Sequence, residues 1–251
     1  MKKIALIAVL LITACSLTAQ DFNQSLQGVK KVKISSPSGV VIKAQNQNEI
    51  KINGEGREMP EKARGLKAVY AGGSDNTGLG IYVQKEGETL VVRNLKGMHS
   101  EVLQIFLPKT VNITIEKSNL GDVEVKGFSS EIEAMTNVGN MTFRDVTGPI
   151  VAKTATGEIN IIFTKVSQNS PISLVSATGA IDVSLPSSTP ANLELKTTMG
   201  EIYTDFDIKF PSDDENMKIV AGKRAIKTQL NSGGVEISLR SSTGNIYLRK
   251  Q

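Results

Sequence analysis

The chain has 251 residues with a formal net charge of +4, and without Lys2 and Lys3 at its start it carries 27 basic and 25 acidic residues. This near balance gives no electrostatic indication of a nucleic-acid or membrane-surface partner. Tryptophan is absent, aromatic residues make up 4% of the chain and His99 is the only histidine, so a metal site built from several histidines is excluded and recognition by rows of stacked aromatic rings is disfavoured.

The N-terminus has the composition of a bacterial export signal. Its basic start is followed by an apolar stretch, residues 4–12, which is shorter than the roughly 20 residues that span a bilayer. Cleavage after Ala19 would remove residues 1–19 as a signal peptide. Alternatively, the sequence before Cys15 resembles a lipobox, which would remove residues 1–14 and attach a lipid to Cys15. Both alternatives predict export to the periplasm, the outer membrane or the exterior, with membrane contact only through that lipid.

The mature chain, residues 20–251, is long enough for one domain with a substantial core. Cys15 is the only cysteine, so this domain contains no disulfide. Its stability must therefore come from apolar burial and backbone hydrogen bonds, even though export would have permitted disulfides.

Two irregular insertions interrupt the chain, near residues 57–80 and 209–222. The first contains a short helical pattern broken by Gly65 and ends in a glycine-rich run. Loops on a rigid scaffold are where binding residues concentrate. The candidate ligand-binding residues are therefore the polar residues of these insertions, namely Asp75, Asn76, Asp213 and Asp214.

A six-residue unit recurs along the chain. It has Ser or Thr three residues before a glycine and an apolar residue two after it, and its glycines are Gly39, Gly121, Gly139, Gly157, Gly179, Gly200 and Gly244. From Gly121 the glycines are 18, 18, 22 and 21 residues apart, and then 44 residues separate the last two. A period of this length is typical of solenoids. The long last interval predicts a degenerate copy or an insertion.

The residues on either side of each glycine alternate between apolar and polar, as in Ile159-Asn-Ile161 and Ile172-Ser-Leu174. This period of two predicts half-buried strands. One strand–glycine–strand unit cannot bury its own apolar face, whereas stacked units share a core. The apolar residues after the glycines are therefore expected to point inward: Val123, Met141, Ile159, Ile181, Ile202 and Ile246.

The glycines are predicted to lie at corners between strands, and several of Gly157, Gly179, Gly200 and Gly244 are expected to have positive φ. The Ser and Thr hydroxyls of the unit can bond to turn backbone. Equivalent hydroxyls at one phase of a repeat, with no G-x-S-x-G motif, indicate structural groups and not nucleophiles. The fold class predicted is all-β.

These units resemble the bacterial putative-adhesin family of β-strand repeats, which is related to the GIN head domain of autotransporter adhesins. The similarity covers roughly Ser35 to Lys250 and includes Leu103-Gln-Ile-Phe-Leu-Pro108, the row of repeat units and the ending Leu230 to Leu248. It implies a single-stranded right-handed parallel β-helix (β-solenoid) with repeats of about 18–22 residues in the bacterial envelope. It implies no catalytic residue.

Catalytic chemistry finds little support in the sequence. A Ser-His-Asp triad would require His99, which falls in a loop between predicted strands. Three carboxylates share one phase of the repeat and could line one face: Asp122, Glu158 and Glu201. Two suitably separated carboxylates suffice for a glycosidase. A solvent-facing strand position accounts for these residues as well. Calcium in the insertions is a weaker alternative, because EF-hand and RTX patterns are absent. No catalytic residue, metal or cofactor is assigned.

The leading hypothesis is a non-enzymatic exported envelope protein that binds an envelope or extracellular polymer or protein through its solenoid face or its insertions. Two alternatives stay open: a polysaccharide-active β-helix enzyme, and a structural or sensory envelope component without a soluble ligand. A deep cleft with converging carboxylates and basic residues would favour the enzyme, whereas a flat face would favour binding or structure.

Overall fold

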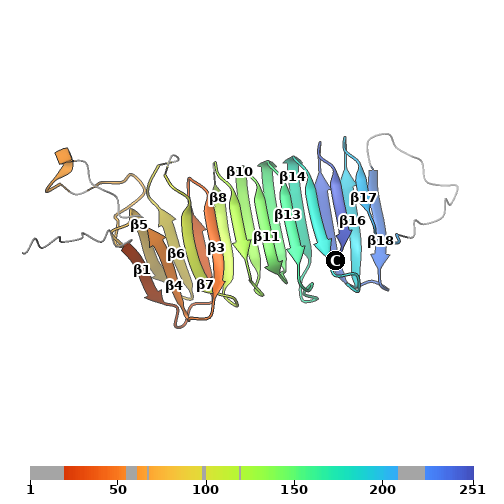
Figure 1. Ribbon diagram of the computed structural model, residues 1–251, viewed down its shortest axis with the longest axis horizontal. Coiled ribbons are helices and arrows are strands. Elements are labelled where there is room, and N and C mark those ends of the chain that lie inside the picture. Colours follow the sequence, from red (N-terminus) through yellow and green to blue (C-terminus); the bar gives the residue numbers. More distant parts are fainter. Residues whose placement is uncertain (1–19, 55–60, 67, 98–99, 119, 209–223) are drawn as a thin grey trace, which may run out of the picture.

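The computed structural model describes residues 20–54, 61–66, 68–97, 100–118, 120–208 and 224–251 (Figure 1). In this part of the chain two ten-stranded sheets contain the strands, and the 3-10 turn η1 (Glu61–Ala63) is the helical element. No helix among these residues is long and apolar enough to cross a membrane. The strands are β1 (Gln20–Ser25), β2 (Lys31–Ser35), β3 (Val40–Gln45), β4 (Glu49–Gly54), β5 (Ile81–Glu86), β6 (Thr89–Asn94), β7 (Leu103–Pro108), β8 (Asn112–Ser118), β9 (Val123–Lys126), β10 (Ile132–Val138), β11 (Met141–Val146), β12 (Ile150–Thr156), β13 (Ile159–Phe163), β14 (Ile172–Thr178), β15 (Ile181–Leu185), β16 (Ala191–Thr197), β17 (Ile202–Thr204), β18 (Arg224–Leu230), β19 (Val235–Ser241) and β20 (Ile246–Lys250).

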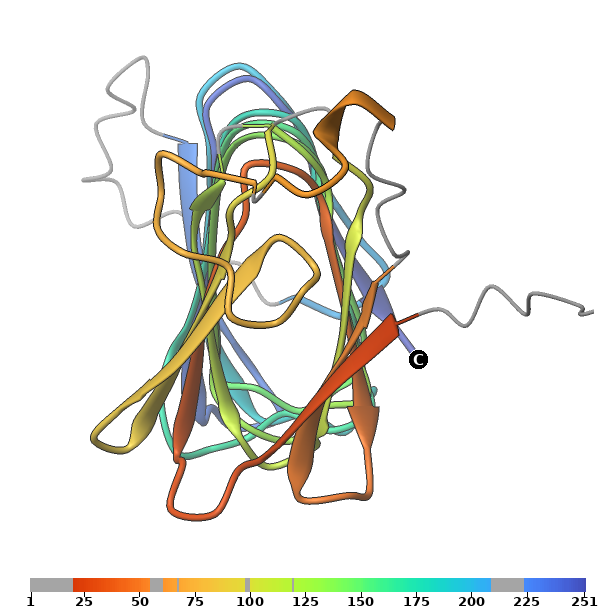
Figure 2. The same cartoon turned by 90° about the vertical axis from the view of Figure 1, so that its left-hand side faces the viewer.

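The two sheets are named sheet A and sheet B, and each coil of the fold consists of a strand in sheet B followed by a strand in sheet A. Sheet A has the order β1-β4-β7-β3-β9-β11-β13-β15-β20-β17, and sheet B has the order β18-β16-β19-β14-β12-β10-β8-β2-β6-β5. Successive coils pair in parallel, as β10 with β12 and β11 with β13. The coils form an elongated stack (Figure 1), and the view along it shows the two sheets as facing walls (Figure 2). The prediction of an all-β solenoid with long parallel sheets is confirmed.

The core lies between the two sheets, where inward side chains of successive coils form rows. The row predicted from the repeat is in register, in the order Val123, Met141, Ile159, Ile181, Ile246 and Ile202. All but the last are buried, while Ile202, at the end of sheet A, is half-buried. The intervening residues of β13 and β15 face outward, which is the alternation that a sheet with one apolar face requires.

The order of the coils in the stack differs from their order in the chain. The C-terminal coil β19/β20 lies between β14/β15 and β16/β17. Coil β2/β3 similarly lies between β6/β7 and β8/β9. Between β17 and β19, the described residues hold the antiparallel strand β18 and no further coil. The described part of the long interval between the last two glycines thus contributes an antiparallel strand to sheet B.

Antiparallel strands close both ends of the stack. β4 and then β1 extend sheet A beyond β7, and β5 extends sheet B beyond β6. At the other end β18 pairs with β16 in sheet B. The predicted parallel arrangement thus holds for the coils but not for these caps, which carry no repeat unit. Caps cover coil edges that would otherwise present unpaired backbone groups.

The repeat glycines stack directly on one another in the order Gly39, Gly121, Gly139, Gly157, Gly179, Gly244 and Gly200. A Cβ added at Gly157 or Gly179 would lie 2.0 Å from the carbonyl oxygen of the glycine in the preceding coil. The φ angles of these two residues are positive, 147° and 140°, as predicted. Positive φ is absent at Gly200 and Gly244, where close approach of the backbones is what requires glycine.

The repeat hydroxyls connect neighbouring coils. The side chains of Thr154, Ser176, Ser241 and Thr197 donate hydrogen bonds of 3.0–3.3 Å to the carbonyl oxygen of a repeat glycine in the adjacent coil. All four side chains are buried, and buried hydroxyls bonded to backbone are structural groups. The prediction that they bond to turn backbone is confirmed, and each bond also crosses from one coil to the next.

Candidate functional site

Asp75, a predicted ligand-binding residue, holds the shape of its own loop. Its Oδ1 accepts hydrogen bonds from the N–H groups of Thr77 (2.9 Å) and Gly78 (3.0 Å) and from the Thr77 hydroxyl (3.0 Å), and its Oδ2 accepts one from the N–H of Gly80 (2.9 Å). Partial burial acts to raise the pKa of Asp75, but these hydrogen bonds together hold the pKa below its usual value. Both carboxylate oxygens are thus engaged within the loop.

Asn76, the second predicted residue of this loop, is engaged with strand β5. Its Nδ2 donates to the carbonyl oxygen of Val83 at 2.7 Å, and its Oδ1 accepts from the N–H of the same residue at 2.9 Å. The amide therefore ties the loop to the cap of sheet B. A ligand at Asp75 and Asn76 would have to compete with these internal hydrogen bonds.

The other predicted site residues, Asp213, Asp214 and the lipidation candidate Cys15, lie outside the described residues, as does His99. Within the described part of the chain, no group of three or more His, Cys, Asp or Glu side chains is arranged to hold a metal ion. The side chains that the structure does bring together lie on the outer faces of the two sheets.

The polar residues that follow the repeat glycines form a row along one corner of the stack. Oδ1 of Asp122 accepts a hydrogen bond from the N–H of Asn140 at 2.7 Å, and Oδ1 of Asn140 accepts one from the N–H of Glu158 at 2.9 Å. Asn245 does the same for Glu201 at 2.9 Å. Side chains of one coil thus bind the backbone of the next, which is a structural use of this phase of the repeat.

The spacing of this row does not favour a pair of catalytic carboxylates. In the stack, Glu158 and Glu201 are separated by the coils of β15 and β20. At about 4.8 Å per strand they lie about 14 Å apart, beyond the roughly 5–9.5 Å that separate glycosidase carboxylates. Asp122, which is two coils from Glu158, is already engaged with the backbone of Asn140.

A group of exposed and half-buried side chains on the outer face of sheet A, over β15, β20 and β17, is the better candidate site. We name it the tyrosine cluster, and it consists of Asp182, Tyr203, Tyr247 and Arg249. The two tyrosine rings are stacked, with centroids 5.4 Å apart and an interplanar angle of 10°. The guanidinium of Arg249 lies 5.3 Å from the centroid of the Tyr247 ring, and Tyr203 remains 47% exposed.

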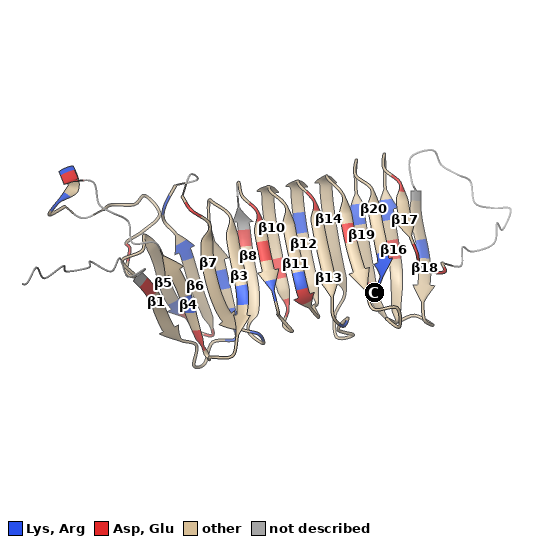
Figure 3. Cartoon of the chain, in the orientation of Figure 1, with Lys and Arg blue, Asp and Glu red and all other residues tan. Residues whose placement is uncertain are grey.

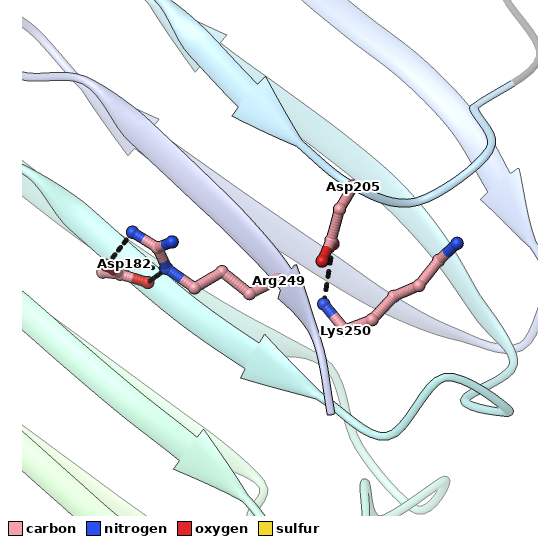
Figure 4. Close-up of polar contacts among 4 residues, drawn as sticks. All are labelled: Asp182, Asp205, Arg249 and Lys250. Atoms are coloured by element: carbon pink, nitrogen blue, oxygen red, sulfur yellow. Dashed lines mark hydrogen bonds and ion pairs between the residues drawn. The ribbon is translucent and has the colours of Figure 1, made fainter.

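Arg249 is fixed by Asp182 on the neighbouring strand (Figure 4). Its Nε donates to Oδ1 and Oδ2 of Asp182 at 2.8 and 3.1 Å, and its Nη2 donates to Oδ2 at 2.9 Å. The hydrogen bonds and the charge of Asp182 raise the pKa of Arg249 above its usual value. Beside this pair, the N–H of Lys250 donates to Asp205 at 2.8 Å, which ties the end of β20 to the segment after β17.

The hydroxyls of the two tyrosines also have partners. Nδ2 of Asn245 donates to the Tyr247 hydroxyl at 3.0 Å, and the Tyr203 hydroxyl donates to Glu201, which raises the pKa of Tyr203. Tyr and Arg are the side chains most enriched at binding hot spots. Here they are carried by strands and not by loops, so their positions are held by the solenoid.

Sequence reasoning missed the tyrosine cluster, because Tyr203 and Tyr247 are 44 residues apart, about twice the spacing of the other repeat units, and the sequence does not show that their coils are neighbours. One signal was available. Each tyrosine directly follows the inward isoleucine of a repeat unit, as Ile202-Tyr203 and Ile246-Tyr247, so both occupy the same outward phase.

The outer face of sheet B carries a second group around Glu194, in a shallow hollow that Lys227 and Glu236 also line. Glu194 accepts a hydrogen bond of 2.6 Å from Arg240 and lies 3.9 Å from the ammonium of Lys227. The bond from Arg240 outweighs desolvation and lowers the pKa of Glu194. A carboxylate kept ionised in this way is poorly suited to act as a general acid, which needs a raised pKa.

Comparison with known proteins identifies the repeat. A family model described as Toastrack DUF4097 matches residues 112–249, more than half of the chain, and confirms the predicted resemblance to a β-strand-repeat family. Among solved structures, the chain is similar to a putative cell adhesion protein from Clostridium sporogenes ATCC 15579, with 10% identity, a TM-score of 0.48, and coverage of 92% of this chain and 99% of that chain. It is also similar to a putative adhesin (BF0245) from Bacteroides fragilis NCTC 9343, with 13% identity, a TM-score of 0.35, and coverage of 92% and 96%. No curated protein matches the chain.

Proposed function

We infer the function from one premise: the chain belongs to the Toastrack DUF4097 family. We propose that it is a non-enzymatic exported envelope protein, an adhesin-like β-solenoid whose outer face binds an envelope or extracellular polymer or protein. The observation that carries this proposal is the tyrosine cluster, in which the exposed Tyr203 ring stacks on the half-buried Tyr247 ring beside an exposed guanidinium on rigid strands. Solenoids suit such partners because they present long, continuous surfaces.

The two alternatives differ from this proposal in what they require. A polysaccharide-active enzyme would need an acid and a base converging in a cleft. The hollow around Glu194 is shallow, and its carboxylate is ion-paired, which supports binding over catalysis. A purely structural or sensory component would have no ligand at the tyrosine cluster, and the experiment below separates it from a binding protein.

We further propose that residues 20–251 form one domain with right-handed coils. A single core cluster that extends from Leu26 to Leu248 supports the first point. The second follows from strand twist, because a connection between two parallel strands of one sheet is right-handed in about 98% of proteins. Here β11, in the opposite sheet, is the connection between the parallel neighbours β10 and β12.

Replacing Tyr203 and Tyr247 together with alanine is expected to abolish ligand capture when the mature chain is used in a pull-down against envelope glycans and proteins. Hot-spot side chains commonly contribute about 2 kcal/mol or more each, so loss of both rings would weaken binding beyond detection. Because both rings lie on the outer face of the sheet, with Tyr203 exposed and Tyr247 half-buried, the variant should stay folded, with a modest change in thermal unfolding. That measurement shows that the loss concerns binding and not folding.

Tyr82→Ala is the matched control. Tyr82 also lies beneath a guanidinium, that of Arg93 at 5.7 Å, but it belongs to β5, at the other end of the stack from β17. Capture by Tyr82→Ala should equal that of the unmodified chain. Capture that survives the double replacement, or that Tyr82→Ala loses equally, would show that the tyrosine cluster is not the contact surface.

Export is expected to leave one of two mature N-termini in the native host. Mass spectrometry of the intact protein should find either a chain that begins at Gln20 or a lipid-modified Cys15. A Cys15→Ala variant distinguishes them, since it would lose membrane association only if the lipid is present. A full-length chain that begins at Met1 in the cytoplasm would overturn the localisation.

A further inference from the structure

Three cations from three coils stand side by side on the outer face of sheet A. Strand β9 lies between β3 and β11, and its Lys126 pairs with Lys43 of β3 on one side and with Arg144 of β11 on the other. Paired residues on neighbouring strands are about 4.8 Å apart. We name Lys43, Lys126 and Arg144 the cationic row; basic residues on these middle strands are marked in Figure 3.

All three side chains point into solvent. Each follows a buried residue of its strand, Ile42, Val125 and Phe143 respectively, and each is itself exposed. The alternation of the strands therefore places the charges on one face.

The row is only weakly neutralised by the protein. Lys126 lies 3.8 Å from Asp145, and Glu124 is two residues before Lys126 on the same face. Within the described part of the chain, no ion pair involves Lys43 or Arg144. Other cations have closer partners, such as Lys33, 2.8 Å from Glu116, and Arg249, 2.8 Å from Asp182. Like charges placed directly opposite each other on adjacent strands are destabilising, and an anionic ligand would relieve that repulsion.

We propose that the cationic row binds a linear acidic polysaccharide that runs along the stack. Fully exposed cations bind a single small anion weakly, whereas a polymer with charges repeated along its length contacts all three at once. The face is formed by strands in register and offers a straight track for an extended chain.

A polysaccharide fits this face better than a nucleic acid does. Proteins that bind single-stranded nucleic acid combine cations with successive aromatic rings on which the bases stack, whereas the cationic row has one half-buried ring, Phe106, beside Lys43 at its end and none between the three cations. The choice of a glycan also rests on the proposed function, which places the protein in the envelope. The row itself is independent of the tyrosine cluster, which lies over β15, β20 and β17.

The test measures binding of the mature chain to polygalacturonate, a linear polyuronic acid, with neutral dextran and an oligothymidylate as the other probes. The unmodified chain should bind polygalacturonate in a salt-sensitive manner, prefer it to the oligonucleotide, and ignore dextran. Lys43→Gln combined with Arg144→Gln should weaken that binding about two- to thirtyfold, which corresponds to about 0.4–2 kcal/mol for the loss of two exposed charge pairs.

A second double variant, Lys153→Gln with Lys196→Gln, removes the same charge from the outer face of sheet B and should bind like the unmodified chain. Equal weakening by both variants would show a general charge effect and overturn the site. Tighter binding of the oligonucleotide, lost in Lys43→Gln/Arg144→Gln, would overturn the ligand class. Absence of polygalacturonate binding would overturn the inference, while the tyrosine-dependent pull-down would still decide the proposed function on its own.

Discussion

Replacing Gly157 with alanine should destabilise the solenoid by about 3 kcal/mol or more, at the upper end of what overpacking costs. The new Cβ would lie 2.0 Å from the carbonyl oxygen of Gly139, and the backbone of Gly157 has a φ of 147°. The colliding atom belongs to the backbone of the next coil, so no side-chain rotation can relieve the contact. Chemical denaturation should show the loss, and the melting temperature should fall by roughly 2–4 °C for each kcal/mol.

Two further glycines separate the two causes of this destabilisation, which are the positive φ and the collision with the neighbouring coil. Gly87 has a φ of 62° with nothing within 4 Å of an added Cβ, so Gly87→Ala reports backbone strain alone. Gly244 lacks positive φ, but its Cβ would lie 2.0 Å from the carbonyl oxygen of Gly179, so Gly244→Ala reports the collision alone. The expected order of destabilisation is Gly157, then Gly244, then Gly87, with about 1 kcal/mol for Gly87. A Gly157→Ala variant no less stable than Gly87→Ala would refute the role of stacking.

The same glycines show how far the sequence predicts the fold. Their spacing indicates coils, corners and inward rows, because a period of about 20 residues leaves few other ways to bury alternating apolar side chains. It does not reveal why glycine is needed at Gly200 and Gly244. That reason is the approach of a neighbouring coil, and contacts between coils have no local signature in the chain.

The stacking order is also beyond local sequence. The coils β14/β15, β16/β17 and β19/β20 carry the same unit, so Gly200 would match Gly179 as well as it matches its actual neighbour, Gly244. Which coil fills which position depends on the connections and on the pairing of β18 with β16, which are properties of the whole chain. The tyrosine cluster and the cationic row depend on this order in part, because β15 with Asp182 lies beside β20 with Arg249, and β3 with Lys43 beside β9 with Lys126, only through the stacking order.

The predicted ligand-binding residues show a second limit of sequence-based prediction, which concerns the use of polar side chains. Asp75 and Asn76 are predicted ligand-binding residues because polar side chains in an irregular loop often bind ligands. In the structure the same chemistry serves the loop, since carboxylate and amide groups satisfy its backbone N–H and C=O groups. Sequence composition cannot distinguish these two uses, because both call for the same oxygen and nitrogen atoms at a turn.

Replacing Ile159 with aspartate should abolish folding altogether. The Ile159 side chain is fully buried between the sheets, with Met141 and Ile181 as its neighbours in the core row. Even after relaxation, burying an unpaired charge costs several kcal/mol, and loss of the apolar side chain adds roughly 2–5 kcal/mol. Together these costs approach or exceed the about 5–15 kcal/mol by which a domain is stable. Circular dichroism and gel filtration of the purified variant would detect the loss of structure.

Ile162→Asp on the same strand is the matched control, because it tests whether the effect depends on the face of the sheet. Ile162 lies on β13 only three residues further on, but its side chain faces outward and is 37% exposed. The two variants share the chemical change and the strand, and differ only in the face of the sheet. A solenoid with alternating faces predicts a folded Ile162→Asp variant whose stability changes by about 1 kcal/mol or less, as at ordinary surface positions. If instead Ile159→Asp folds while Ile162→Asp does not, the register of β13 is shifted by one residue, and with it the assignment of every outward residue in the coils beside it.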